Sequence, residues 1–153
     1  MRQVSILKFA DKMNEVMPVI IKGFARRQTD ELYKGKITLP QFLILEFLYK
    51  EGGSKMTTLA HYMEVTTAAM TGIVDRLVKC GYIIRIFDSS DRRIIKTKLT
   101  PKGAELVKRI TQQRRQMIIN IFGKISEVER NNYLSILMRI SDILAKQKEA
   151  QAG

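Results

Sequence analysis

The chain of 153 residues is poor in the residue types that build disulfide frameworks and metal sites. It contains one cysteine, Cys80, and one histidine, His61. A single thiol cannot form an intrachain disulfide, and a lone histidine without a cysteine cluster argues against a metal site. No nucleophile–base–acid set or glycine-rich phosphate loop stands out, so we expect neither an enzyme nor a cofactor. We expect Cys80 to be a partly buried, inert thiol and His61 to face solvent or a phosphate.

Aromatic residues and long apolar runs are also scarce. The chain has no tryptophan and 7% aromatic residues against 45% hydrophobic residues, which predicts a core of mainly Leu, Ile, Val and Met. The longest apolar stretches, such as Val16 to Ile21, are too short to span a bilayer, and no secretory apolar run forms before Asp11 and Lys12. We therefore expect a soluble, cytoplasmic protein that has no membrane partner.

Positive charge, in contrast, is in excess. The chain has 27 Lys and Arg residues against 15 Asp and Glu residues, a net charge of +12. Residues 75–115 hold 12 of the basic and 4 of the acidic residues, whereas residues 126–153 hold 4 of each. This excess predicts a polyanionic partner, and its concentration in one segment favours nucleic acid over a membrane surface. A merely basic, solvated surface is the alternative interpretation.

Helical periodicity and capping residues predict the elements on either side of that segment. The first expected helix runs from about Val4 to Arg27, with a kink or break at Pro18. The second begins at the capping box Thr38/Gln41 and ends at about Lys50, before Gly52-Gly53. A short third helix over Leu59–Met63 is capped by Thr57 or Thr58, and the last helix begins at the capping box Ser126/Glu129. Glu64-Val65 is expected to form a turn after the short helix.

The segment from Val65 to Gly103 carries the strongest pattern. Thr66 caps a helix that ends at Lys79-Cys80-Gly81, and alternating residues over 82–87 and 94–99 predict two strands. A polar, protruding tip, Asp88 to Arg93, joins the strands, and Thr100-Pro101 starts another helix. Helix, strand, basic tip, strand and helix outline a winged helix-turn-helix. The predicted fold is mainly α with a small β-hairpin wing.

The helix that follows Thr66 has two unlike faces. Its apolar positions, Ala69, Met70, Ile73, Val74 and Leu77, are expected in the core. The outer face carries small residues first (Thr67, Ala68, Thr71, Gly72) and longer charged ones later (Asp75, Arg76, Lys79). Small side chains let a helix approach base edges in the major groove, and long basic ones reach phosphates. An ion pair between Asp75 and Arg76 is also expected.

Apolar stripes remain on the first helix and on the two helices after residue 100. The winged unit needs only part of this apolar surface, and long terminal helices of this kind usually meet a second copy of themselves. A two-fold dimer would present its recognition helices about 34 Å apart, one turn of DNA.

These motifs resemble the multiple-antibiotic-resistance regulator (MarR) family of prokaryotic transcription factors. Asp91-Arg92-Arg93, followed by Leu99-Thr100 and Gly103, is similar to the family's wing signature. Thr71 with Asp75-Arg76-Leu77 and Gly81 is similar to the recognition-helix ending, and Thr38 with Gln41 to the start of the preceding helix. The resemblance implies a homodimer with a DNA-binding domain at residues 34–102 and a dimerisation region at residues 1–33 and 103–153. Gly72 departs from the family, where many members carry a longer polar or basic residue.

The same resemblance implies a function. Arg93 takes the place of the wing arginine that enters the minor groove, with Asp91 orienting it, and Arg92 is expected on a phosphate. The expected DNA-binding residues are Thr66, Thr67, Ala68, Thr71, Arg76, Lys79, Asp91, Arg92 and Arg93, with Thr66 acting mainly as a helix cap. We expect a repressor that binds double-stranded DNA. A small aromatic or other apolar effector is expected to release the repressor from the DNA. A winged helix that contacts protein or RNA is the alternative.

Overall fold

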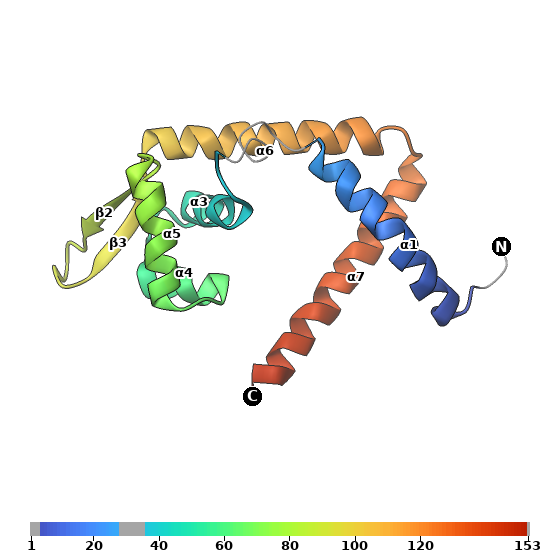
Figure 1. Cartoon of the computed structure of the whole chain (residues 1–153), viewed down its shortest axis with the longest axis horizontal. Coiled ribbons are helices and arrows are strands. Elements are labelled where there is room, and N and C mark those ends of the chain that lie inside the picture. The colour runs from blue at the N-terminus through green and yellow to red at the C-terminus, as the bar shows by residue number, and fades with distance from the viewer. Residues whose placement is uncertain (1–3, 28–35, 153) are drawn as a thin grey trace. The chain divides into compact units, whose positions relative to one another are not determined.

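The computed structural model describes residues 4–27 and 36–152 (Figure 1). The elements are α1 (Ile6–Ala25), α3 (Leu39–Glu51), β1 (Ser54–Lys55), α4 (Met56–Met63), α5 (Thr67–Lys79), β2 (Ile83–Phe87), β3 (Ile95–Leu99), α6 (Pro101–Phe122) and α7 (Glu127–Ala152). The predicted mainly helical fold with a β-hairpin wing is confirmed. The chain divides into two units, residues 1–114 and 115–153. The predicted domain boundary at residues 33 and 34 lies outside the described residues.

Reciprocal side-chain caps begin two of the helices at the predicted positions. Thr38 Oγ1 accepts from the Gln41 backbone N–H, and Gln41 Oε1 accepts from the Thr38 N–H at 2.9 Å, which completes the capping box of α3. Ser126 and Glu129 make the same reciprocal pair at α7. Gly52 ends α3 in the left-handed conformation, with φ of 73°. Of the kink or break predicted at Pro18, the break does not occur, since α1 continues through this residue, and the kink stays a prediction.

The start of α4 differs from the prediction. The helix begins at Met56, and its N-cap residue is Lys55, which makes no side-chain capping hydrogen bond. Thr57 and Thr58 therefore lie inside the first turn and do not cap it. The reason is β1, which ends at Lys55 in extended backbone and passes directly into the helix. The predicted turn at Glu64-Val65 is present, with Glu64 left-handed at φ of 56°.

The sheet is antiparallel and has three strands in the order β1-β3-β2. Phe87 pairs with Ile95 near the tip of the hairpin and Ile83 with Leu99 at its base. The short strand β1, which the sequence did not predict, joins the other edge of β3. Thr97 is fully buried there and donates its hydroxyl hydrogen bond to the Ser54 carbonyl at 3.0 Å.

The core lies in the first unit, where α3, α4, α5, β2 and the first half of α6 meet. Its fully or nearly fully buried side chains are Ile37, Phe42, Ile44, Leu45, Leu48, Leu59, Ala60, Met70, Val74, Leu77, Ile83, Leu106, Val107 and Ile110. This aliphatic composition matches the prediction, apart from Phe42. Three of the residues belong to α5, so the core holds one side of that helix and leaves the other side outside.

Backbone contacts around Gly103 join the wing to the end of α5. A Cβ atom on Gly103 would lie 2.2 Å from the Tyr82 carbonyl oxygen, so only glycine permits this approach. The Thr100 hydroxyl donates to the Gly81 carbonyl at 2.6 Å and accepts from the Gly103 N–H at 3.0 Å. Lys102 Nζ donates to the Cys80 carbonyl at 2.8 Å. The end of α5, the base of the hairpin and the start of α6 therefore form one fixed junction.

The second unit contains the end of α6, a short turn and α7. Arg130 Nη1 donates to the carbonyls of Phe122 (3.2 Å) and Ile125 (2.5 Å), and the rings of Phe122 and Tyr133 stack at 5.4 Å. Every side chain from Asn131 to Gln147 is exposed. Among the described residues, no helix combines the length and apolar character needed to cross a membrane.

Candidate nucleic-acid interface

The outward face of α5 carries most of the predicted recognition residues. Its buried residues are Met70, Val74 and Leu77, spaced four and three apart, so they form one stripe. The predicted contact residues of this helix are all exposed: Thr67, Ala68, Thr71, Arg76 and Lys79. Ala69 is exposed as well, and its predicted place in the core is wrong, because it lies about 100° around the helix from Met70.

The hydroxyl groups of Thr66 and Thr71 have different partners. Thr66 Oγ1 accepts from the Ala69 N–H at 3.2 Å, so this residue caps α5 as predicted. The Thr71 hydroxyl donates to the Thr67 carbonyl at 2.8 Å, one turn back along the helix. Its proton is therefore engaged, and its oxygen lone pairs and methyl group remain for an external partner.

An ion pair connects α5 to the wing. Asp75 Oδ1 accepts from Arg85 Nη2 of β2 at 2.5 Å. The predicted pair of Asp75 with Arg76 is wrong, since adjacent residues of a helix do not face each other. Arg85, which was not among the predicted contact residues, reaches Asp75 because the strand runs back alongside α5 (Figure 1).

Two aspartate-based turns build the wing tip. Asp91 Oδ1 accepts from the Arg93 backbone N–H at 2.9 Å, and the Asp91 carbonyl accepts from the Ile94 N–H at 2.9 Å. The carboxylate therefore holds the backbone that carries Arg93, and any orientation of the guanidinium by Asp91 acts through that backbone. Arg92 and Arg93 are both exposed at this turn.

Asp88 anchors the other side of the tip. Although the sequence places it in a polar loop, its exposed fraction is only 8%. Lys96 of β3 pairs with its carboxylate, which also accepts from the Ser90 hydroxyl and from the Ser90 N–H at 2.8 Å. The hydrogen bonds from Lys96 and Ser90 hold the pKa of Asp88 well below its usual range. The carboxylate is therefore ionised at neutral pH and fixes the tip to β3.

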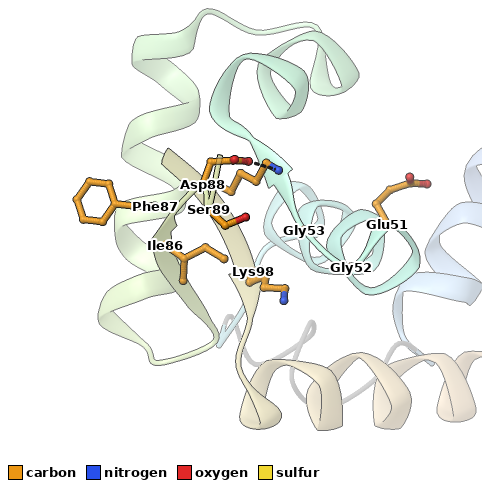
Figure 2. A pocket seen from close by; sticks show the side chains of 9 residues that line it. Glu51, Gly52, Gly53, Ile86, Phe87, Asp88, Ser89 and Lys98 are labelled. Carbon is orange, nitrogen blue, oxygen red and sulfur yellow. Dashed lines mark ion pairs between the residues drawn. The ribbon is translucent and has the colours of Figure 1, made fainter. Parts of the chain in front are cut away.

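A hollow of about 340 Å³ lies next to this anchor, between the hairpin and the turn after α3 (Figure 2). Residues 51–53 form one wall, and residues of β2 and β3, including Lys96 and Lys98, form the other. Asp88, labelled in Figure 2, and its ion-pair partner Lys96 both line the hollow. The hollow is open to solvent.

Cys80 and His61 are both exposed to solvent. Cys80 is exposed, so the expectation of a partly buried thiol is wrong. It is the C-cap residue of α5, and the neighbouring core positions are filled by Leu77 and in part by Val78. His61 is exposed on α4, as expected. No cluster of three or more His, Cys, Asp or Glu residues that could hold a metal ion occurs in the part of the chain that the structure describes.

These features define a winged helix-turn-helix module. An exposed helix carries small residues at its start and basic residues at its end, and a hairpin beside it projects two arginines. The helix α5 and the hairpin are joined to each other at two points, the junction around Gly103 and the Asp75–Arg85 ion pair. Such a surface suits duplex DNA, in which one groove admits a helix and the neighbouring narrow groove attracts arginine.

Comparison with known proteins agrees with this class. The sequence model that represents the MarR family matches residues 37–95 of this chain, which include the helix-turn-helix and most of the wing. The HTH-type transcriptional repressor MdtR of Bacillus subtilis (strain 168) is 25% identical over 148 residues, which are 94% of this chain and 91% of MdtR.

Solved structures give the same assignment. A MepR-like protein complexed with pseudoligands is 30% identical, with a TM-score of 0.57 over 88% of this chain and 94% of that one. FabT of Streptococcus pneumoniae, solved in complex with DNA, shares the fold with a TM-score of 0.76 at 20% identity, over 90% of this chain and 98% of FabT. The chain belongs to the MarR family, and it is a DNA-binding transcriptional regulator and not an enzyme.

Proposed function

We propose that this regulator is a homodimeric repressor that binds a pseudo-palindromic operator. The observation that carries the proposal is the exposed face of α5 beside the basic tip of the wing. In each subunit α5 enters the major groove and the wing enters the adjacent minor groove. Residues 34–102 are the proposed DNA-binding domain, and residues 1–33 and 103–153 the dimerisation region.

The proposed contacts fall into two groups. Thr67, Ala68 and Thr71 lie near the start of α5 and approach base edges, whereas Arg76 and Lys79 reach phosphates from its end. At the wing, Arg93 enters the minor groove, Arg92 contacts a phosphate, and Asp91 holds the turn that presents them. Thr66 belongs to this surface as the residue that fixes the start of the helix.

Apolar side chains on the terminal helices support the proposed dimer. On α1 they include Ile6, Phe9, Met13 and Ile20, and on α7 they include Tyr133, Leu137, Ile140 and Leu144, all of them exposed. Soluble monomers rarely expose contiguous apolar stripes of this size, because burying them against a second copy removes them from water. Two-fold symmetry then places two copies of α5 about one DNA turn apart.

Repression follows from occupancy of a promoter. A bound dimer blocks RNA polymerase, and an aromatic or other apolar effector releases it by changing the spacing of the two recognition helices. The repressor MdtR and the MepR-like protein with its pseudoligands support this part of the proposal. Footprinting on the promoter shared with the neighbouring gene tests whether the protein protects that promoter. Transcription from a protected promoter should be stronger when the protein is absent.

A binding selection on randomised duplexes tests the DNA-binding mechanism. We expect enrichment of a sequence with two inverted half-sites, and gel shifts in which structured RNA competes poorly. If a dimer neutralises about 8 to 10 phosphates, log K should fall against log salt with a slope of roughly −7 to −9. A slope near zero, or equal binding of RNA, would contradict the proposal and favour the protein-binding or RNA-binding alternative.

A further inference from the structure

Two apolar side chains are exposed side by side on the wing. Phe87 at the end of β2 is 69% exposed, and Ile95 at the start of β3 is 43% exposed. The two residues are direct partners in the strand register, so their side chains form one patch near the hairpin tip. Leaving a phenyl ring in water is unfavourable, which makes this patch a candidate contact surface.

The strand alternation places this patch on the face of the hairpin nearer to α5. Ile83, Arg85 and Phe87 lie on the same face of β2, because successive side chains of a strand point to opposite faces. Ile83 is buried in the core, and Arg85 is paired with Asp75 of α5. In Figure 2 the Phe87 ring points away from the side chains of Ile86 and Lys98. The patch therefore belongs to the side of the wing that borders the recognition helix.

Positive charge lies next to the patch, at the tip of the hairpin. Arg92 and Arg93 are exposed there, whereas Arg85 and Lys96 are paired with Asp75 and Asp88 and Lys98 lies on the opposite face. An apolar patch beside two exposed arginines is complementary to a polymer that alternates anionic groups with apolar C–H surface. The sugar–phosphate backbone of DNA has this chemistry, whereas an apolar protein surface lacks the anionic groups.

We infer that Phe87, supported by Ile95, packs on deoxyribose rings of the DNA strand that passes between the groove of α5 and the groove of the wing. This inference rests on the proposed DNA-binding mode and adds a sugar contact to it. A ribose would present its 2′-hydroxyl to the phenyl ring, and burying that hydroxyl without a partner is unfavourable. Phe87 is thus a residue that selects DNA over RNA.

The mutational test uses Phe87→Ser with Ile84→Ser as the matched control. Ile84 lies in the same strand, is 46% exposed, and pairs with Lys98 on the opposite face of the hairpin. Phe87→Ser should weaken binding of the selected operator about tenfold or more, since an aromatic burial is lost at each wing. Phe87→Leu should recover most of this loss, and Ile84→Ser should stay within about twofold of the wild type.

The salt dependence distinguishes a sugar contact from a phosphate contact. Phe87→Ser removes no phosphate contact, so DNA binding releases the same number of counterions as in the wild type. The plot of log K against log salt should therefore have the same slope as that of the wild type, at lower values of log K. Replacing the deoxynucleotides that footprinting locates beside the wing by ribonucleotides should weaken binding of the wild type but not of Phe87→Ser. Equal sensitivity of the two proteins to these ribonucleotides would overturn the inference.

A fluorescent variant gives a direct readout. The chain has no tryptophan, so Phe87→Trp introduces a single tryptophan at the patch, whose emission can be excited selectively over that of the tyrosines. Operator DNA should quench its emission or shift it to shorter wavelength, and unchanged emission at saturation would reject the contact. Wild-type affinity of Phe87→Ser would reject it too, and a protein would then be the better occupant. If the wild type binds no duplex at all, the proposed function fails before any variant is compared.

Discussion

The guanidinium of Arg93 is exposed at the wing tip, while its backbone N–H donates to Asp91. We expect Arg93→Ala to weaken operator binding by about 1–3 kcal/mol per subunit, with the greatest loss on sites that are A·T-rich under the wing. Arg93→Lys should restore only part of the loss, because an ammonium lacks the planar fork of a guanidinium. Titration of operators that differ only under the wing measures both effects.

Asp91 should behave differently from Arg93, because its contact is with the backbone. Asp91→Asn keeps a side-chain oxygen that can accept from the Arg93 N–H, so its affinity should stay close to that of the wild type. Asp91→Ala removes the acceptor and should lose part of the energy that Arg93→Ala loses. If both alanine variants keep wild-type affinity and site preference, the wing is a solvated hairpin and the family resemblance fails at this position.

The buried carboxylate of Asp88 should make the stability of the wing depend on pH. Its pKa is lowered in the folded protein, so the ionised form contributes stability above the unfolded-state pKa of about 3.9, and this contribution is lost as the pH falls further. Urea unfolding of Asp88→Asn should therefore show a deficit at pH 7 that shrinks below about pH 4. In the Asp88→Asn background, Lys96→Met should add little. A deficit that is independent of pH would contradict this role.

At the scale of single elements, α5 is expected to separate sequence preference from affinity. Thr67→Val and Thr71→Val keep the side-chain volume but remove the hydroxyl, so they should change which operators a selection enriches. The change at Thr71 should reflect a lost acceptor, because its proton is already donated to Thr67. Arg76→Ala and Lys79→Ala should instead weaken all sequences about equally and reduce the salt slope by about one per lost phosphate contact.

Thr66→Val is the control for these variants. Its hydroxyl caps α5, so we expect a loss of about 1 kcal/mol in the free energy of unfolding, with little effect on sequence preference. Unchanged preferences for both Thr67 and Thr71 variants would mean that α5 positions the protein without reading the bases.

The junction at the base of the wing gives a test that uses two glycines. Gly103→Ala would place a methyl group within 2.2 Å of the Tyr82 carbonyl oxygen, so the backbone must shift, at a cost of about 3 kcal/mol. Gly72→Ala is the matched control, because nothing lies within 4 Å of its Cβ position and alanine favours the helix by about 1 kcal/mol. Thermal unfolding should show opposite shifts, and a neutral Gly103→Ala would contradict the tight approach.

The elements that the sequence predicted well depend on interactions between residues close together in the chain. The caps at Thr38, Thr66 and Ser126 each involve a partner three residues away, so the spacing alone predicts them. The apolar spacing of α5 likewise predicted its buried stripe, and the alternation over residues 82–99 predicted the hairpin. These patterns placed the candidate contact residues on exposed surfaces.

The features that the sequence did not predict depend on contacts between different helices and strands. The two residues of β1 show no strand pattern of their own and become a strand only because β3 offers them an edge. The sequence predicted that α4 starts at Leu59. Because β1 leads directly into the helix, α4 starts at Met56. Arg85 pairs with Asp75 only once the hairpin lies beside α5, and Lys96 pairs with Asp88 only once the two strands of the hairpin come together.

At the scale of the whole molecule, exposed apolar helices predict a concentration-dependent assembly. Sedimentation at micromolar concentration should give twice the mass of the 17.6 kDa chain, and the thermal midpoint should rise with protein concentration. Leu137→Glu should shift the equilibrium towards monomer by adding charge to the stripe of α7. Ser135→Glu, on the opposite side of that helix, should not. A stable, folded wild-type monomer would exclude the proposed dimer.

The third strand also has a kinetic consequence. Ser54 and Thr97 are bonded across 43 residues, whereas the loop between β2 and β3 spans residues 88–94. Closing the longer loop costs about 1.6 kcal/mol more in chain entropy, so the hairpin should form first and β1 should dock late. Amide protons that bridge β1 and β3 should then exchange with solvent sooner than those between β2 and β3. The wing can thus loosen at its β1 edge while the register that presents Arg93 stays intact.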